Sequence, residues 1–120
     1  QHPDDFNKRN QNLSSYRYSL VKDNFSHVAV VDGLFIATSA DLPWDEETLD
    51  GWDFYDAFQS MNYLLNGYHI VVPNQKHPWC LHDDKKVLNM FRYDEYRQKF
   101  IDKYSHVLGL DYKKIQAIFS

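Results

Sequence analysis

The sequence predicts a mixed α/β protein in which a few strands carry flanking helices. Short apolar runs, typical of strands, alternate with longer stretches in which apolar residues recur every three or four positions, as on one face of a helix. The chain has 120 residues, enough for one domain with a modest core. The apolar runs predict only two or three strands, too few for an independent sheet with both faces covered. We therefore expect the chain to be part of a larger fold.

The first half of the chain predicts an arm and then a strand. Residues 1–26 are polar and rich in Asn and Ser, so we expect an irregular N-terminal arm before a folded part at 27–120. Residues 27–38, HVAVVDGLFIAT, are a nearly continuous apolar run that predicts a strand buried on both faces. Asp32 and Gly33 interrupt this run, and a tight hairpin turn between two short strands is the alternative.

An acidic loop at 39–53 leads into a predicted helix. Its apolar face is indicated by residues at spacings of four, three and four: Phe54, Phe58, Met61 and Leu65. Gly67 stands where a glycine commonly ends a helix. Asp53 is the expected N-cap and Asp56 an acidic first-turn residue, although a helix start could also present Asp56 as a catalytic base.

The second half repeats the strand–loop–helix order. Residues 68–73, YHIVVP, predict a short strand closed by Pro73, and a loop rich in His, Trp and acids follows. Residues 86–106 predict one long or broken helix, and Gly109 separates it from a last short helix at 111–119.

Composition narrows the class of function. The formal charge of −4 argues against a general nucleic-acid or anionic-membrane binder. Cys80 is the one cysteine of the chain and cannot form an internal disulfide, which favours a reducing, cytoplasmic location. The aromatic share of 17% is high enough to expect some rings on a surface that stacks on a ligand.

Three stretches carry a resemblance when they are taken in order: VVDGLFIAT, LPWDEETLDGWDFYDAFQSMNYLLNGYHIVVP and PWCLHDD. Together they resemble the C-terminal half of a family-2-like glycosyltransferase with the GT-A fold, the fold of nucleotide-diphospho-sugar transferases. More narrowly, they are similar to the streptomycin-biosynthesis-protein-like group. The resemblance covers about residues 28–84.

The resemblance implies a catalytic residue. In such enzymes a Glu-Asp pair commonly opens a helix that ends in Gly-Tyr. Counting back from the Gly-Tyr at Gly67 places the Asp of the pair at Asp56, which would take the proton of the acceptor hydroxyl. Tyr55 stands where the Glu is common, so one carboxylate remains for this role.

The resemblance also implies ligands. His82 would help to hold a divalent cation, Mn²⁺ or Mg²⁺, on the donor diphosphate, although a lone His beside two Asp is more often a surface residue. Asp32 and Gly33 would lie near the donor sugar, where a missing side chain permits close approach. Trp52 and Trp79 could stack on sugars or belong to the core.

These implications define the expected function. We expect a metal-dependent, inverting transfer of a sugar from a nucleotide-sugar donor to a glycan or small-molecule acceptor. Residues 27–120 would form the acceptor-side part of the domain, and the chain alone would be inactive because residues 1–26 are too short for a nucleotide-binding half. A cut sheet would favour self-association into a homo-oligomer. The alternative is a non-catalytic carbohydrate-binding or protein-interaction module.

Overall fold

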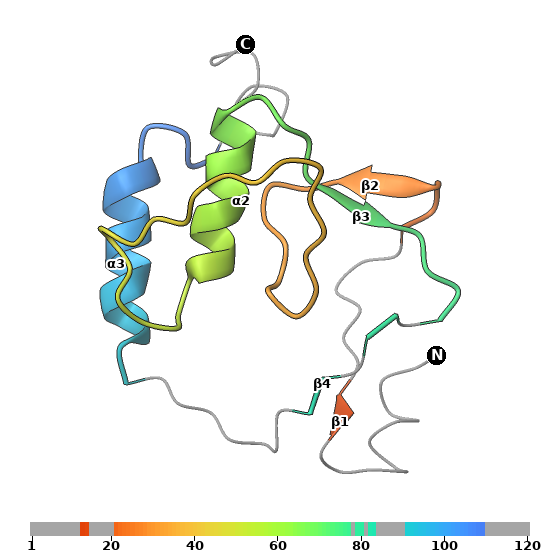
Figure 1. The fold of residues 1–120 in the computed structure, drawn as a ribbon, viewed down its shortest axis with the longest axis horizontal. Coiled ribbons are helices and arrows are strands. Elements are labelled where there is room, and N and C mark those ends of the chain that lie inside the picture. The colour runs from red at the N-terminus through yellow and green to blue at the C-terminus, as the bar shows by residue number, and fades with distance from the viewer. Residues whose placement is uncertain (1–12, 15–20, 78, 81, 84–90, 110–120) are drawn as a thin grey trace. The chain divides into compact units, whose positions relative to one another are not determined.

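The computed structural model describes residues 13–14, 21–77, 79–80, 82–83 and 91–109. The chain divides into two compact units: the first comprises residues 1–26 and 72–89, and the second comprises residues 27–71 and 90–120. Figure 1 shows the elements in chain order: β1 (Leu13–Ser14), β2 (Phe25–His27), α2 (Tyr55–Leu65), β3 (Val71–Pro73), β4 (His82–Asp83) and α3 (Tyr93–Tyr104). The described part therefore contains both helices and strands, as the predicted α/β class requires. Within it, neither helix combines the length and the apolar character that a membrane crossing needs.

The strands form two short antiparallel pairs. β1 pairs with β4, with Leu13 opposite Asp83. β2 pairs with β3, and backbone bonds extend this ladder at each end, from the Asn74 N–H to the Asn24 carbonyl (2.8 Å) and from the Val28 N–H to the Ile70 carbonyl (3.0 Å). The strand predicted at 68–73 is confirmed for its second half, which is β3, whereas residues 68–70 are not part of a strand.

The strand predicted at 27–38 is wrong beyond its first residue. β2 ends at His27, and residues 28–38 follow as irregular backbone with large exposed side chains at Val30, Leu34 and Phe35. Neither does this segment form the alternative hairpin. A strand needs a neighbour for its backbone groups, and β3 is three residues long. Beyond Val28, N–H groups of the segment bond instead to side chains of α2, as described below.

Helix α2 begins without the predicted cap. Its N-cap residue is Phe54, which has a left-handed backbone (φ 63°) and makes no side-chain capping bond, so the assignment of Asp53 as the cap is wrong. The predicted end is confirmed. Gly67 has φ +85°, and bonds from the Gly67 N–H to the Leu64 carbonyl and from the Tyr68 N–H to the Tyr63 carbonyl, both 3.0 Å, close the helix in a Schellman motif.

Helix α3 occupies the middle of the region predicted as one long or broken helix. It runs from Tyr93 to Tyr104, whereas residues 86–90 lie outside the described part. Gly109 has φ +85°, in keeping with the predicted break. The helix predicted at 111–119 also lies outside the described residues.

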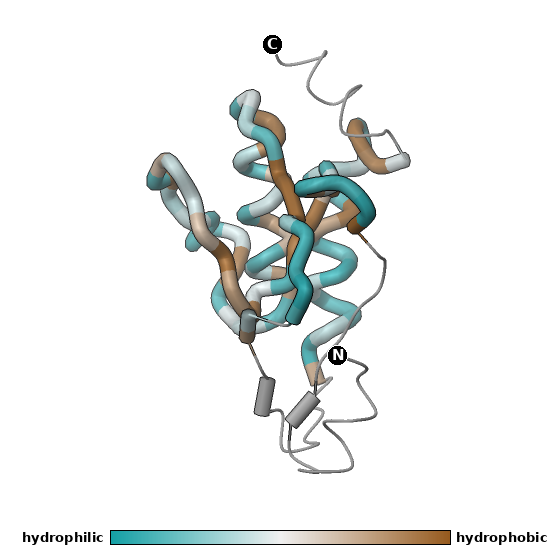
Figure 2. The backbone as a smooth tube through the Cα atoms, turned by 90° about the vertical axis from the view of Figure 1, so that its right-hand side faces the viewer, coloured by the Kyte–Doolittle hydropathy of each residue, from teal (hydrophilic) through white to brown (hydrophobic). Residues whose placement is uncertain are grey.

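The core of the second unit lies between α2 and α3, which are side by side in Figure 1. Phe54, just before α2, contacts Tyr93 at the start of α3, with ring centroids 5.0 Å apart. Phe58, one turn further, contacts Tyr104 at the end of α3 (5.4 Å), so the two helices run in the same direction. The buried cluster comprises Phe58, Met61, Leu64, Tyr104 and Val107. Figure 2 shows polar and apolar residues alternating around the helical turns, as amphipathic helices require.

Candidate active site

Asp56 joins the start of α2 to the loop that follows β2. Its Oδ2 accepts a hydrogen bond from the backbone N–H of Gly33 (2.9 Å), and its Oδ1 accepts one from the N–H of Ala57 (2.7 Å). The second bond satisfies one of the free N–H groups of the first helical turn, where negative charge is favoured. The structure therefore brings together two of the residues predicted for the site, and it gives Asp56 a structural role at the helix start.

Ser60 makes a second link between the same two segments. Its hydroxyl accepts a hydrogen bond from the Val31 N–H (3.2 Å) and donates one to the carbonyl of Asp56 (2.7 Å). Ser60 is buried, with 3% of its surface exposed. Sequence reasoning missed this residue, although its position four residues after Asp56 places it on the same helix face.

The Asp32-Gly33 pair forms a turn, but not a hairpin. The Leu34 N–H donates to Oδ1 of Asp32 (3.0 Å), so the side chain of Asp32 closes an Asx turn. A Cβ atom on Gly33 would lie 2.0 Å from the hydroxyl oxygen of Tyr55 and 2.5 Å from its Cζ. The close approach that glycine permits here is therefore the approach of Tyr55.

Tyr55 is the centre of an aromatic cluster. The Trp52 ring lies 5.3 Å from it and the Trp44 ring 6.0 Å, each tilted by just under 50°. Trp52 is 81% exposed and Trp44 is 49% exposed, so the assignment of Trp52 to the core is excluded. Burial raises the pKa of Tyr55, and the charges of Asp56 and Asp32 raise it further. Sequence reasoning missed Trp44, although it precedes the acidic run at Asp45.

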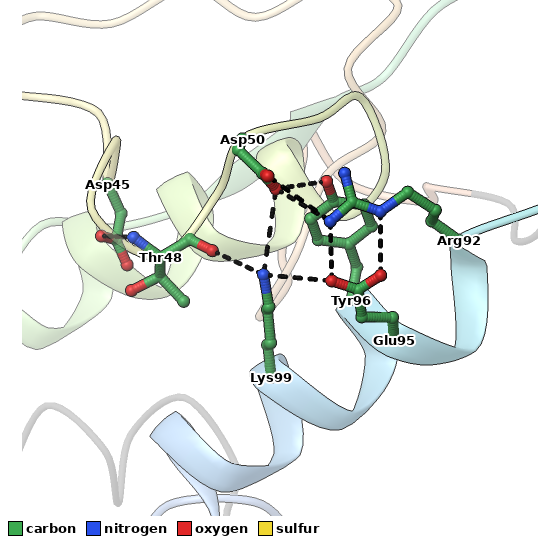
Figure 3. Close-up of polar contacts among 7 residues, drawn as sticks. All are labelled: Asp45, Thr48, Asp50, Arg92, Glu95, Tyr96 and Lys99. Carbon is green, nitrogen blue, oxygen red and sulfur yellow. Dashed lines mark hydrogen bonds and ion pairs between the residues drawn. The ribbon is translucent and has the colours of Figure 1, made fainter.

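The loop between Trp44 and Trp52 is bound to α3 (Figure 3). Asp50 accepts a hydrogen bond from the Tyr96 hydroxyl (2.6 Å) and forms an ion pair with Arg92 (3.2 Å), while Lys99 donates to the Thr48 carbonyl (3.2 Å). A Cβ atom on Gly51 would lie 2.1 Å from the Tyr96 hydroxyl, so the loop backbone rests on that ring.

A second anchor holds this loop at its start. Asp45 accepts a hydrogen bond from the Thr48 N–H (3.1 Å) and pairs with Lys103 of α3. Burial raises the pKa of Asp45, but the hydrogen bonds from Lys103 and Thr48 outweigh burial and bring the pKa below its usual value. The segment that carries both tryptophans is thus fixed near each end.

The contacts with α3 shift three further pKa values. Hydrogen bonds from Tyr96 and Arg92 lower the pKa of Asp50. The hydrogen bond from Arg92 lowers the pKa of Glu95 to about 2. The hydrogen bond to Asp50, together with burial, raises the pKa of Tyr96 to about 12.

Two buried phenols make the fold sensitive to alkali. The pKa of Tyr104 is also raised to about 12, by burial and by the charge of Asp45, whereas an unfolded tyrosine titrates near 10. The folded chain therefore keeps protons that the unfolded chain loses, so the stabilisation is complete below about pH 10 and is lost as the pH rises towards about 12. We expect the free energy of unfolding to fall across this window, measured by urea unfolding at a series of pH values.

Tyr96→Phe supplies the control for that measurement. This variant removes one of the two shifted phenols, so its free energy of unfolding should fall less steeply over the same window. An unchanged slope would mean that Tyr96 titrates alike in the folded and unfolded chains.

Trp79 and His82 belong to the first unit, whereas the residues described above belong to the second. Trp79 is 62% exposed and its backbone N–H donates to Oε1 of Gln75 (3.1 Å), so the assignment of Trp79 to the core is excluded as well. The backbone of His82 lies in β4 opposite Ser14. Cys80 is a half-buried free thiol.

The described residues do not by themselves assemble a metal centre. Across the part of the chain that the structure covers, no three His, Cys, Asp or Glu side chains lie close enough together to hold a cation. The role of His82 as one ligand among several therefore stays a prediction.

A comparison with protein families identifies the class of protein. The model of a glycosyltransferase-like family matches residues 6–104, which is more than half of the chain. The chain therefore belongs to this glycosyltransferase-like family. Searches of curated proteins and of solved structures gave no match.

Proposed function

We propose that the protein takes part in transferring a sugar from a nucleotide-sugar donor to an acceptor hydroxyl, with inversion at the anomeric carbon. The observation that supports this role is the fixed carboxylate of Asp56, held between the first turn of α2 and the Asp32-Gly33 turn. In this proposal the chain forms the acceptor side of a GT-A fold similar to that of the streptomycin-biosynthesis-protein-like group.

Asp56 would act as the general base. The acceptor hydroxyl attacks the anomeric carbon, its proton passes to the carboxylate, and the bond to the diphosphate breaks with the electron pair leaving on the phosphate oxygen. A single displacement of this kind inverts the anomeric configuration. Each carboxylate oxygen of Asp56 accepts one hydrogen bond from the protein, and a carboxylate oxygen has a second lone pair that can accept a proton.

The fixed position of Asp56 favours this role. The links from Gly33 and Ala57 orient both carboxylate oxygens, and Ser60 holds the same loop one turn further along α2. A base that is already oriented avoids the entropic cost of being positioned during the reaction. Asp32 would contact the donor sugar from the turn beside it.

A divalent cation, Mn²⁺ or Mg²⁺, would complete the catalytic set by neutralising the departing diphosphate. We assign His82 as one of its ligands, with the others from an Asp-x-Asp motif in a nucleotide-binding half outside residues 1–120. Because the nucleotide-binding half would supply these ligands in this proposal, this chain alone should be inactive.

The test is transfer by the full-length protein, followed over a range of Mn²⁺ concentrations. Removal of the cation by a chelator should abolish transfer, and NMR of the product should show the inverted anomer. His82→Ala should raise the Mn²⁺ concentration for half-maximal activity by about 10-fold, with partial rescue by excess Mn²⁺.

His77→Ala is the matched control, since His77 is an exposed histidine in the same unit. This variant should leave the Mn²⁺ dependence unchanged. Transfer that persists after chelation would remove the cation from the proposal, and a retained anomer would remove the single displacement.

A further inference from the structure

Three neighbouring rings form one contiguous patch, those of Trp44, Tyr55 and Trp52. We call this patch the aromatic surface. Tyr55 lies in the middle, with tryptophans 6.0 Å and 5.3 Å away by ring centroid. Trp44 is about half exposed (49%) and Trp52 is mostly exposed (81%). An exposed indole gives up the free energy that burial would provide, so its exposure on a fixed surface indicates a binding role.

The exposed rings are held in place by the segment that carries them. Asp45 follows Trp44 directly and is paired with Lys103, and Asp50 stands two residues before Trp52 and is bound to Tyr96. Anchoring near both ends lowers the conformational entropy that a ligand would otherwise have to remove. The aromatic surface is therefore suited to bind a rigid ligand without rearrangement.

Carboxylates adjoin the aromatic surface. The Tyr55 hydroxyl lies over Gly33, whose N–H is bound to Asp56. The charges that act on this hydroxyl come from Asp56 and Asp32, both anions. Carboxylates only accept hydrogen bonds, so the complementary ligand offers an apolar face for the rings and hydroxyl donors along its edge. A pyranose sugar has both.

The charges beside the aromatic surface distinguish between the donor and the acceptor of a transferase. A nucleotide-sugar donor carries a diphosphate, which the carboxylates of Asp32 and Asp56 would repel. The cations that contact this loop, Arg92, Lys99 and Lys103, are engaged with acidic side chains. The carboxylates of Asp32 and Asp56 are compatible with the uncharged sugar of the donor beside Asp32. They make the aromatic surface unfavourable for the donor's diphosphate and for acidic sugars, and favourable for an uncharged glycan.

We propose that the aromatic surface binds the sugar acceptor and that this acceptor is an uncharged glycan, stacked on Trp44 and Trp52. This inference rests on the proposed transferase function only in calling the glycan the acceptor. Binding itself requires neither the cation nor the chemistry at Asp56.

The test is direct binding to the full-length protein, measured by calorimetry with three probes: a panel of neutral oligosaccharides, oligosaccharides that contain uronic acids, and a nucleoside diphosphate. Trp44→Ala and Trp52→Ala should each raise the Kd for the neutral glycan by about 5- to 100-fold, the range that follows from stacking on one aromatic ring. Phe91→Ala is the control, because Phe91 is a 91% exposed aromatic residue outside the surface and should leave the Kd unchanged.

Each outcome of these binding measurements either supports or overturns the proposal. A Kd for neutral glycans that rises in both tryptophan variants and not in Phe91→Ala supports the proposal, provided that thermal unfolding shows the variants folded. No binding of any neutral glycan, a Kd unmoved by Trp52→Ala, or equal affinity for acidic glycans overturns it. Sensitivity of nucleoside diphosphate binding to Trp52→Ala overturns it too, since the rings would then serve the donor.

Failure of the transferase function would look different. Glycan binding that depends on both tryptophans, in a protein that transfers no sugar with any donor, would leave the aromatic surface valid and the catalytic role of Asp56 wrong. Such a protein would be the non-catalytic carbohydrate-binding module.

Discussion

Replacement of Asp56 by Asn in the full-length protein should lower kcat by about 10²- to 10⁴-fold, the usual loss when a general base is removed. An amide has nearly the volume of the carboxylate but cannot take the acceptor proton at neutral pH. The loss should appear in kcat more than in KM, because the proton moves in the transition state. Steady-state kinetics at neutral pH would measure both quantities.

The same replacement should also destabilise the fold. Both oxygens of Asp56 accept backbone N–H groups, from Gly33 and Ala57, whereas Asn offers one acceptor oxygen and one donor NH₂. One N–H therefore loses its partner, which costs about 1–3 kcal/mol.

Ser60→Ala separates the two effects. It removes the acceptor of the Val31 N–H and so weakens the attachment of the same loop, while the carboxylate of Asp56 remains. We expect a loss of stability comparable to that of Asp56→Asn, but a fall in kcat of less than about 10-fold, since the base is still in place. If the two variants lose activity equally, Asp56 serves only to hold the loop.

Phe58→Ala should destabilise the second unit by about 3–5 kcal/mol. Phe58 is 1% exposed, and the rings of Phe100 and Tyr104 lie against it edge-on at 5.5 and 5.4 Å. Truncation leaves a cavity between α2 and α3 that these rings fill only in part. Since single domains are stable by about 5–15 kcal/mol, this one change should remove a large share of the total.

Urea unfolding followed by circular dichroism measures that loss. Phe91→Ala makes the same chemical change at a position 91% exposed, and it should shift the free energy of unfolding by less than about 0.5 kcal/mol. A small loss at Phe58 would show that the contact between the helices contributes little to stability.

Local signals in the sequence predicted those parts of the fold that local interactions determine. The apolar spacing predicted α2, and Gly67 predicted its end, because the period of a helix and the need for a left-handed residue are both local. The strand at 27–38 failed because a strand depends on a neighbour. Among the described residues, the only strand beside this apolar run is β3, which is three residues long. Backbone N–H groups of the run therefore bond to side chains of α2 instead.

The candidate site was predicted in the same uneven way. Asp56, Gly33 and Trp52 were singled out from the sequence, and the structure places all three in one region. Trp44 and Ser60 were missed because their roles depend on how the acidic loop and α2 pack, and these contacts join residues far apart in the sequence. The prediction of Asp53 as the N-cap was wrong for a related reason, since contacts with aromatic rings of α3, and not a polar side chain, fix the start of α2.

The left-handed backbone of Phe54 makes the candidate site depend on α3, a helix that contributes no candidate catalytic residue and no ring of the aromatic surface. A non-glycine residue in this conformation costs about 1–2 kcal/mol, and the contacts of the Phe54 ring with Tyr93 (5.0 Å) and Phe100 (5.8 Å) offset this cost. Asp56 follows only two residues after Phe54, so the contacts between Phe54 and α3 help to fix the orientation of the Asp56 carboxylate. A chain shortened to residue 90 would keep every candidate catalytic and aromatic residue, yet it would lose the two rings that hold Phe54 in its strained conformation.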